Sequence, residues 1–537
     1  MWAIIDYIAD HCTRKDVEYI IFGFNLQYEW TQLFHDVPYH VKIAPDFEIT
    51  LRTDKQHTAR IRATNNKRYM ATIEMGGTKR RVKLIDAMAY FVGSLDSAAK
   101  IIGVGSKLAK PKTFTRKGAR DAMFLAYAKH DAILTQRLGE WIIDLHTTYD
   151  VPTCISAPHF AARTFRHRYL TREIPLAPEP LEQYGLDSYH GGKNGFYLPK
   201  PTILPSIWHY DIRSAYPEAM RQLPNIETAQ WIATNTYEPN VHAIWEVTGY
   251  AKRCTYRALM HHDAKWITGR FTRVRVTSYE LDTALALGEV TITRCIGWVM
   301  RGESGGPLQR YVDDFYTLKQ FAKTDAERAA AKLFLNSLYG KFFQKSPLGN
   351  VTGYDIDSHK MVITDPEQDY DYEAGGLYHP PIASLITGYV RAKIHRLEHQ
   401  YRSVMTSTDG FFAYQPPDET ALGDRLGMLT AEIGTLRIWR ERLYVFTPRK
   451  VKHEKECQNG CKKLHQTYAM HGFRGDLTQL HRMPLTTGMK FHYQAQTMIT
   501  LKMSTRAYGK GKAARKYQPG EFVALPFDVI LPSSNGP

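Results

Sequence analysis

Two acidic residues that lie far apart in the sequence, Asp211 and Asp409, constrain the fold most, because each stands where a predicted strand ends or bends. Asp211 lies in an alternating run at residues 207–212, and Asp409-Gly410 forms the bend of a hairpin predicted over residues 403–414. On neighbouring strands the two carboxylates would converge, and such a pair can hold two divalent cations for phosphoryl transfer. Each motif alone has a simpler explanation, because a strand-end Asp often caps the next helix and Asp-Gly is most often a turn.

A third motif is predicted to be helical and reads Lys332-Leu-Phe-Leu-Asn336-Ser-Leu-Tyr339-Gly340-Lys. At 3.6 residues per turn, Lys332, Asn336 and the pair Tyr339-Gly340 share one face. The helical rise separates Lys332 from Tyr339 by roughly 10 Å, which is about the span of a nucleotide from terminal phosphate to base. An ordinary amphipathic helix is the alternative, but Asn-Ser and Tyr-Gly are poor helix formers, which favours a functional reason for them.

The composition is that of a multi-domain globular protein. The 537 residues predict three or four domains, and 43% hydrophobic with 23% charged residues excludes a disordered or fibrous chain. No run of 18 apolar residues occurs, and the first residues carry Asp6 without a basic leader, so we expect a cytoplasmic protein without a membrane partner. Six cysteines, mostly scattered, do not form a disulfide framework.

The positive charge is concentrated near the C-terminus. The chain has 70 Lys and Arg against 54 Asp and Glu, a net charge of +16, and residues 437–516 contain 18 basic and 4 acidic residues. Aromatic residues are interleaved with this basic stretch, as on surfaces that follow a nucleic acid backbone. A solvated basic face is the alternative interpretation.

Taken in order, the three motifs resemble motifs A, B and C of family B DNA polymerases, and Tyr189-His-Gly191-Gly192 is similar to the Y-x-G-G segment of the protein-primed branch. The resemblance implies a multi-domain α/β fold. An RNase H-like 3′–5′ exonuclease-type domain, incomplete at its N-terminus, would precede a right-hand polymerase of palm, fingers and thumb with two insertions. The implied domains are an exonuclease-like domain at 1–151, palm at 152–222 and 377–471, a first insertion at 223–305, fingers at 306–343, a second insertion at 344–376 and a thumb at 472–537.

The resemblance also implies a role for each matching residue. Asp211 and Asp409 would be catalytic and, with the Ile212 carbonyl, would hold two Mg²⁺ ions, with Mn²⁺ as an alternative. Tyr216 would be the steric gate against ribonucleotides. Ser407 departs from the family pattern, which has an Asp there. The other implied contacts are nucleotide binding by Ser214, Lys319, Lys332, Asn336, Tyr339 and Gly340, and DNA or primer binding by Tyr189, Gly191, Gly192, Arg442 and Tyr444.

The exonuclease motifs are incomplete. Asn25 and Glu29 resemble the second motif, with Glu29 where Asp is usual, and Tyr127 and Asp131 resemble the third. The first motif, a D-x-E on an earlier strand, has no room before Asn25. Too few carboxylates then remain to hold two Mg²⁺ ions firmly, so we predict weak or absent proofreading. A start codon assigned too late would explain the gap equally well.

A separate cluster of metal-binding residue types comprises His453, Cys457, Cys461 and His465. Two Cys and two His suit tetrahedral zinc, but the C-x-x-x-C spacing is loose, and a basic exposed loop with two thiols is the alternative.

The resulting functional prediction is a template-directed DNA polymerase, protein-primed and strand-displacing. Its predicted partners are template-primer DNA, deoxynucleoside triphosphates and a terminal protein, and we expect a monomer. The alternative is a catalytically silent DNA-binding or terminal-protein-docking factor on the same scaffold. Tyr216 and the absence of Y-x-D-D disfavour an RNA-synthesising or reverse-transcribing enzyme.

Overall fold

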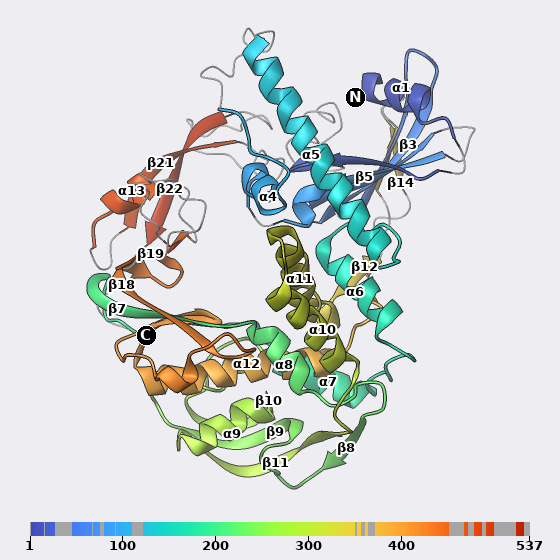
Figure 1. Cartoon of the computed structure of the whole chain (residues 1–537). Coiled ribbons are helices and arrows are strands. Elements are labelled where there is room, and N and C mark those ends of the chain that lie inside the picture. The colour runs from blue at the N-terminus through green and yellow to red at the C-terminus, as the bar shows by residue number, and fades with distance from the viewer. Residues whose placement is uncertain are drawn as a thin grey trace.

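The structure is a computed structural model that describes residues 2–14, 17–26, 46–66, 68–75, 80–91, 93–109, 122–348, 352–355, 360–363, 371–449, 467–470, 477–485, 490–498 and 522–530. The described residues form a seven-stranded N-terminal sheet and a seven-stranded central sheet. A smaller four-stranded sheet lies at the end of the molecule opposite the N-terminal sheet (Figure 1). In the part of the chain that the structure describes, no helix is both long and apolar enough to cross a membrane.

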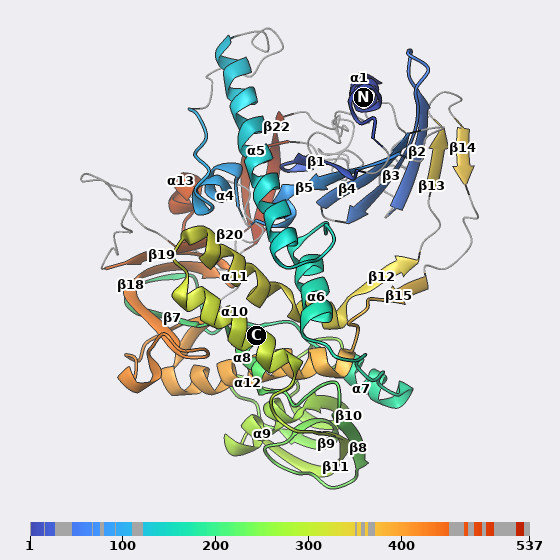
Figure 2. The same cartoon turned by 45° about the vertical axis from the view of Figure 1, so that its right-hand side comes forward.

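The N-terminal sheet has the order β1-β5-β4-β3-β2-β13-β14, and its last two strands come from a distant segment of the chain (Figure 2). β1 is parallel to β5, and β13 is parallel to β2. Helix α1 (Trp2–His11) packs Ile5 and Ile8 into the sheet's apolar core. The strands are β1 (Tyr19–Gly23), β2 (Asp46–Arg52), β3 (Thr58–Asn66), β4 (Arg68–Met75), β5 (Arg80–Asp86), β13 (Thr352–Asp355) and β14 (Lys360–Ile363).

Along the chain, several helices follow strand β5 of the N-terminal sheet. The 27-residue helix α5 runs over Ala122–Thr148, where the sequence predicts a helix at residues 119–146. Its buried face, which includes Leu134, Leu138 and Ile142, belongs to the main core of the molecule. The neighbouring elements are the 3₁₀ helix η1 (Ala87–Ala89), α4 (Leu95–Ile101), α6 (Ala157–Arg168) and α7 (Glu179–Ser188).

The central sheet has the order β20-β19-β18-β7-β17-β16-β6 and carries the residues that the sequence singles out. Helix α12 (Pro380–Tyr401) contacts this sheet through β16 and β17 and the four-stranded sheet through β9 and β10, so it is apolar around most of its circumference. The remaining elements here are β6 (Lys193–Phe196), β7 (Thr202–Ile212), α8 (Ala215–Gln222), β16 (Ser403–Thr408), β17 (Gly410–Ala413), η4 (Glu419–Ala421), β18 (Leu429–Arg440), β19 (Leu443–Pro448) and β20 (Thr467–Met470).

Two packed antiparallel helices, α10 (Pro307–Phe321) and α11 (Asp325–Ser337), stand above the central sheet. Thr324 and Glu327 form a capping box that starts α11. The predicted helix through Gly340 is wrong at its end, because α11 stops at Ser337 and Tyr339–Phe343 form the 3₁₀ helix η3. The poor helix propensity of Asn-Ser and Tyr-Gly accounts for this break.

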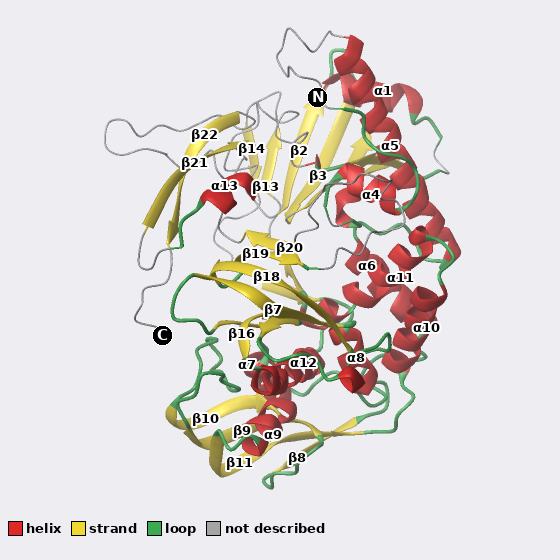
Figure 3. Cartoon of the chain, turned by 60° about the vertical axis from the view of Figure 1, so that its left-hand side comes forward, coloured by secondary structure: helices red, strands yellow, loops and turns green. Residues whose placement is uncertain are grey.

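The four-stranded sheet, in the order β10-β9-β11-β8, is formed by residues between α8 and α10. Figure 3 shows α5, α6, α10 and α11 along one side of the molecule and β21 with β22 on the other. The remaining elements are β8 (Gln230–Thr234), β9 (His242–Ala251), β10 (Gly269–Thr277), α9 (Ser278–Ala286), β11 (Val290–Arg301), β12 (Lys345–Leu348), β15 (Asp371–Ala374), α13 (Leu477–Arg482), β21 (Lys490–Met498) and β22 (Phe522–Ile530).

Candidate active site

The structure brings Asp211 and Asp409 to the same end of neighbouring strands. Asp211 lies at the end of β7, opposite Gly410 of β17 in an antiparallel pair. The backbone N–H of Ile212 donates to the carbonyl of Asp409 at 3.0 Å. The α8 helix begins after Ser214, which forms no side-chain cap, so capping does not explain the acidic residue at this strand end.

The hairpin bend lies one residue earlier than predicted. Ser407 pairs with Gly410, so Thr408 and Asp409 form a two-residue turn and Gly410 already belongs to the strand. Thr408 has a φ of 64°, a strained value for a β-branched residue. The turn therefore fixes the position of Asp409, and the strained backbone of Thr408 destabilises the fold locally.

The two carboxylates share a site whose nearby cations only partly balance their charge. Burial by the surrounding protein, and then the charge of Asp409, raise the pKa of Asp211 to about 6, although nearby cations oppose the shift. Burial also raises the pKa of Asp409. Among the residues that the structure describes, neither carboxylate takes part in an ion pair, so the pair is suited to a divalent cation.

Two lysines from the helices α10 and α11 lie on the positive side of the site. Lys319 donates from Nζ to Oγ of Ser214 at 3.1 Å. Burial, and then the charge of Lys332, lower the pKa of Lys319. Lys332 and Asn336 are exposed on α11, and Lys332 is the cation that most lowers the pKa of Asp211. The two cations face the carboxylates across the site, as binding of a polyphosphate requires.

Stacked aromatic rings form a wall beside the carboxylates. The ring of Tyr216 stacks on Tyr339 with centroids 4.2 Å apart and an interplanar angle of 4°. Tyr189 stacks on Phe343 at 3.6 Å and 10°. A Cβ at Gly192 would lie 2.5 Å from Cγ2 of Thr408 and 3.0 Å from the Tyr216 hydroxyl, so only glycine lets the chain pass this close.

Gly191 and Gly340 are different, because a Cβ on either would have no neighbour within 4 Å. The backbone at both positions is open for a ligand to approach.

Two further predicted site residues lie on the other side of β7 from Asp409. Tyr444 of β19 is buried, and burial, followed by the charge of Asp211, raises the pKa of Tyr444. Arg442 is exposed at the turn between β18 and β19 with a φ of 55°.

Arg391 is a residue that the sequence reasoning did not assign to the site. It is buried in α12, where Nε and Nη2 donate to the two carboxylate oxygens of Glu280 at 2.7 and 2.9 Å. Its Nη1 also donates to the carbonyls of His190 and Gly191, the latter at 3.2 Å. Arg391 thus fixes the segment that carries Tyr189 and Gly192. An arginine inside an apolar helical run was the signal that could have revealed this role.

Three of the four predicted exonuclease residues line one cavity of about 660 Å³, namely Asn25, Tyr127 and Asp131. Lys107 forms an ion pair with Asp131 at 2.6 Å and lies 4.8 Å from the centroid of the Tyr127 ring. The fourth residue, Glu29, and the predicted zinc ligands His453, Cys457, Cys461 and His465 lie outside the described residues.

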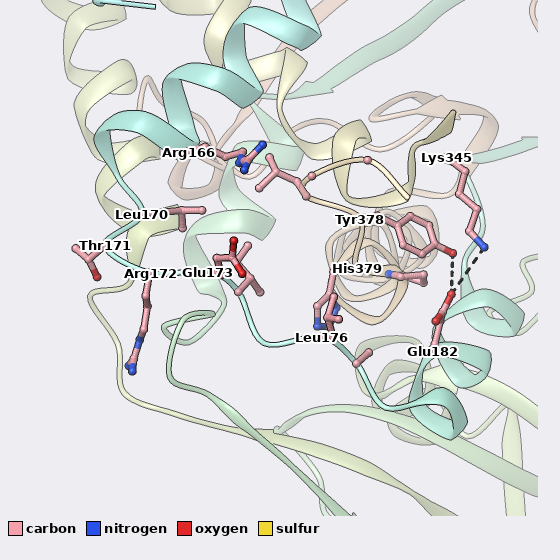
Figure 4. Close-up of a pocket in the computed structure, with 16 residues that line it drawn as sticks. Arg166, Leu170, Thr171, Arg172, Glu173, Leu176, Glu182, Lys345, Tyr378 and His379 are labelled. Atoms are coloured by element: carbon pink, nitrogen blue, oxygen red, sulfur yellow. Dashed lines mark hydrogen bonds and ion pairs between the residues drawn. The ribbon is translucent and has the colours of Figure 1, made fainter. Parts of the chain in front are cut away.

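A second pocket, of about 740 Å³, lies beside the start of α12 (Figure 4). Arg166, Arg172 and Lys345 line it together with Glu173 and Glu182. Lys345 and the Tyr378 hydroxyl both interact with the Glu182 carboxylate. None of the predicted site residues lines this pocket, so we do not assign it to the candidate active site.

Comparisons with known proteins agree with this arrangement. Residues 113–372 match the family model "DNA polymerase type B, organellar and viral". A probable DNA polymerase of Agaricus bitorquis is 27% identical over 248 residues, which cover 44% of this chain and 30% of that protein. The chain therefore spans less than a third of the length of this curated relative.

Solved structures share the fold at low sequence identity. Phi29 DNA polymerase complexed with primer-template DNA superposes with a TM-score of 0.68 and 13% identity, covering 98% of this chain and 92% of the other. Its ternary complex with primer-template DNA and incoming nucleotide gives a TM-score of 0.67 over 98% and 93% of the two chains. The predicted fold class is confirmed: residues 113–372 match the organellar and viral type B DNA polymerase model, and the chain has the fold of phi29 DNA polymerase.

Proposed function

We propose that the chain is a template-directed DNA polymerase that extends a primer 3′-hydroxyl with deoxynucleotides. The observation that carries this proposal is the convergence of Asp211 and Asp409 opposite Lys319 and Lys332. Two carboxylates without a cationic partner, facing two lysines, suit a metal-bound triphosphate. The curated relative and the solved structures of the same fold are named as DNA polymerases, which supports the same activity.

The residues at the carboxylate pair fit Mg²⁺, because both carboxylates are without an ion-pair partner in the described structure and repel one another. Asp211, Asp409 and the carbonyl of Ile212 would hold it, and Mn²⁺ is an alternative. A divalent cation held by these groups would supply charge neutralisation for phosphoryl transfer. Ser407 replaces an acidic residue of the family pattern, so the metal ligands of this site come from the remaining carboxylates.

The protein's own side chains bind and orient the substrates. Lys332 and Lys319 bind the triphosphate from α11 and α10, and Ser214 positions Lys319. The stacked Tyr216 ring closes the space beside the sugar and so disfavours a 2′-hydroxyl. Positioning and charge neutralisation supply most of the rate in such reactions. The remaining contacts in this proposal are nucleotide binding by Asn336, Tyr339 and Gly340, and primer or DNA binding by Tyr189, Gly191, Gly192, Arg442 and Tyr444.

We further propose that the polymerase is protein-primed and strand-displacing, and that it acts as a monomer on template-primer DNA. Residues 223–305 would contact a terminal protein and template duplex, and residues 344–376 would encircle DNA. The four-stranded sheet within the first segment and the strands β12 to β15 within the second support treating both as insertions. The remaining divisions follow the predicted domains, with fingers at 306–343 and a thumb at 472–537.

The test of the central activity is primer extension by wild type, Asp211→Asn and Asp409→Asn, with deoxy- and ribonucleotides in parallel. Either variant should lose at least about 100-fold in rate, because each removes charge from the metal site. Asp418→Asn is the matched control, since Asp418 is an exposed cap of η4 away from the site. Unchanged extension in both site variants would contradict the assignment of the carboxylate pair as the catalytic site. Primer-template binding by wild type without any extension would support the catalytically silent alternative.

Proofreading by this chain is proposed to be weak or absent. Lys107 neutralises Asp131 at 2.6 Å, which removes negative charge that a second metal site would need. Digestion of a mismatched primer with Mg²⁺ and no nucleotides measures this directly. We expect slow or undetectable excision, and brisk excision that Asp131→Asn abolishes would contradict the proposal.

A further inference from the structure

A buried cluster of two histidines and a glutamate joins helix α12 to the four-stranded sheet, away from the carboxylate pair. His395 and His399 lie one turn apart on α12, and Glu289 lies between α9 and β11. The coordinating atoms of the three side chains all lie within 4.8 Å of one another. His-x-x-x-His on one helix face is a spacing that places two imidazoles on one metal ion.

His399 and Glu289 are in close contact. Nε2 of His399 lies 2.7 Å from Oε1 of Glu289, which is an ion-pair distance, and both atoms are buried. Glu289 itself is only 6% exposed. A metal ion bound to both atoms at about 2.0–2.1 Å would require them to move slightly apart.

The second histidine is held as metal-binding histidines are held. Nε2 of His395 lies 2.8 Å from the other Glu289 oxygen, and its Nδ1 lies 3.3 Å from Oε2 of Glu398. Nζ of Lys193 lies closer to this Nδ1, at 2.7 Å, so Lys193 and Glu398 together fix the orientation of the imidazole, whose Nε2 faces Glu289. Glu398 is itself anchored by Lys193 at 2.5 Å and by the hydroxyl of Tyr197 at 2.6 Å.

The backbone on the sheet side is equally fixed. The N–H of Glu289 donates to the carbonyl of Ala284 at 2.9 Å, and the N–H of Lys252 donates to the carbonyl of Glu289 at 2.8 Å. The carboxylate is therefore presented to α12 from a rigid position. Helix α12 lies directly against α9 and this sheet (Figure 1).

We propose that Glu289, His395 and His399 bind a zinc-type divalent transition-metal ion that fastens the four-stranded sheet to α12. Two imidazole nitrogens and one carboxylate oxygen are a common zinc donor set, with water in the fourth position. This site is independent of the proposed polymerase activity and of the cysteine-containing cluster at residues 453–465. A protonated His399 paired with Glu289 is the competing explanation.

The experiment measures zinc bound to the full-length protein. A chelator first removes metal, and Zn²⁺ is then added. Excess Mg²⁺ is present throughout to occupy the carboxylate pair. Because Cys457 and Cys461 could also bind zinc, all measurements use the Cys457→Ser/Cys461→Ser background. In that background we expect about one zinc per chain. We also expect a melting temperature that rises with zinc concentration.

Two variants locate the ion. Glu289→Gln and His399→Gln keep the side-chain volumes similar, and each should lose at least about tenfold in zinc affinity. Each should also lose the zinc-dependent rise in melting temperature. His262→Gln, an exposed histidine of the same insertion, is the matched control and should behave as the background protein. Absence of zinc binding in the background, or binding unchanged in both variants, would overturn the proposal. Circular dichroism of the metal-free proteins verifies that each variant is folded.

Discussion

At the residue scale, the pair Asp211 and Asp409 lowers the stability of the fold in order to form a metal site. Asp211 and Asp409 both have raised pKa values because burial and, for Asp211, the neighbouring charge disfavour ionisation. Like charges that nearby cations only partly balance destabilise the fold in which they are held. Strain at Thr408 in the turn adds to the same effect.

Asp211→Asn should therefore stabilise the metal-free protein at alkaline pH. The pKa of Asp211 is raised from 3.8 to about 6 on folding, so its ionisable carboxyl favours the folded state fully below pH 3.8 and loses this effect as pH rises through about 6. At pH 8 without divalent cations we expect the variant to melt about 1–2 °C above wild type. Calorimetry from pH 4 to pH 8 would measure how this difference grows.

The control for this measurement is Asp418→Asn. The side-chain hydrogen bond with Thr420, and then the backbone N–H of Thr420, lower the pKa of Asp418, so its neutralisation should give no stabilisation at pH 8. Equal melting temperatures of wild type and Asp211→Asn at every pH would contradict the account of the carboxylate pair.

At the scale of elements, helix α12 connects the site to the rest of the fold. Arg391 holds Glu280 of α9 on one side and the backbone of residues 190–191 on the other. Both charges are almost completely buried, with side-chain exposures of 2% and 4%. A buried ion pair is more sensitive to loss of one partner than to replacement of both.

Arg391→Leu should consequently destabilise the protein by about 3–5 kcal/mol, because Glu280 would remain buried without its cation. The double variant Arg391→Leu/Glu280→Leu should be closer to wild type in stability while still binding primer-template more weakly, since the support of Gly191 is lost. Urea unfolding and DNA-binding titrations of the three proteins measure both effects. Strictly additive destabilisation in the double variant would show that the two residues do not form a coupled pair.

The local elements of the site were predictable because their signals are local. Alternation predicts β7, the Asp-Gly sequence predicts the hairpin within one residue, and periodicity predicts α11. The end of α11 was missed although its weak helix formers were visible. The pairing of β13 with β2, and the meeting of Glu289 with His395 and His399, join residues far apart in sequence, which no short-range pattern encodes.

At the scale of the whole molecule, the central sheet places one end of β7 and β17 beneath the helices α10 and α11 (Figure 1). Two chain segments far apart in sequence supply the carboxylates, and two further helices supply the lysines. The order of the motifs along the chain, through the family resemblance, predicted that the carboxylates and lysines converge. Composition alone predicted only a basic, nucleic-acid-binding protein. The central claim is that one metal site joins Asp211 and Asp409.

Metal-directed cleavage tests that claim most directly. Fe²⁺ substituted for Mg²⁺, with ascorbate and peroxide, cuts the backbone next to the bound ion, and mass spectrometry locates the cuts. We predict two cuts, near residues 211 and 409, that excess Mg²⁺ suppresses together and that Asp409→Asn reduces together. Cuts at only one of the two positions, or at neither, would contradict a shared metal site.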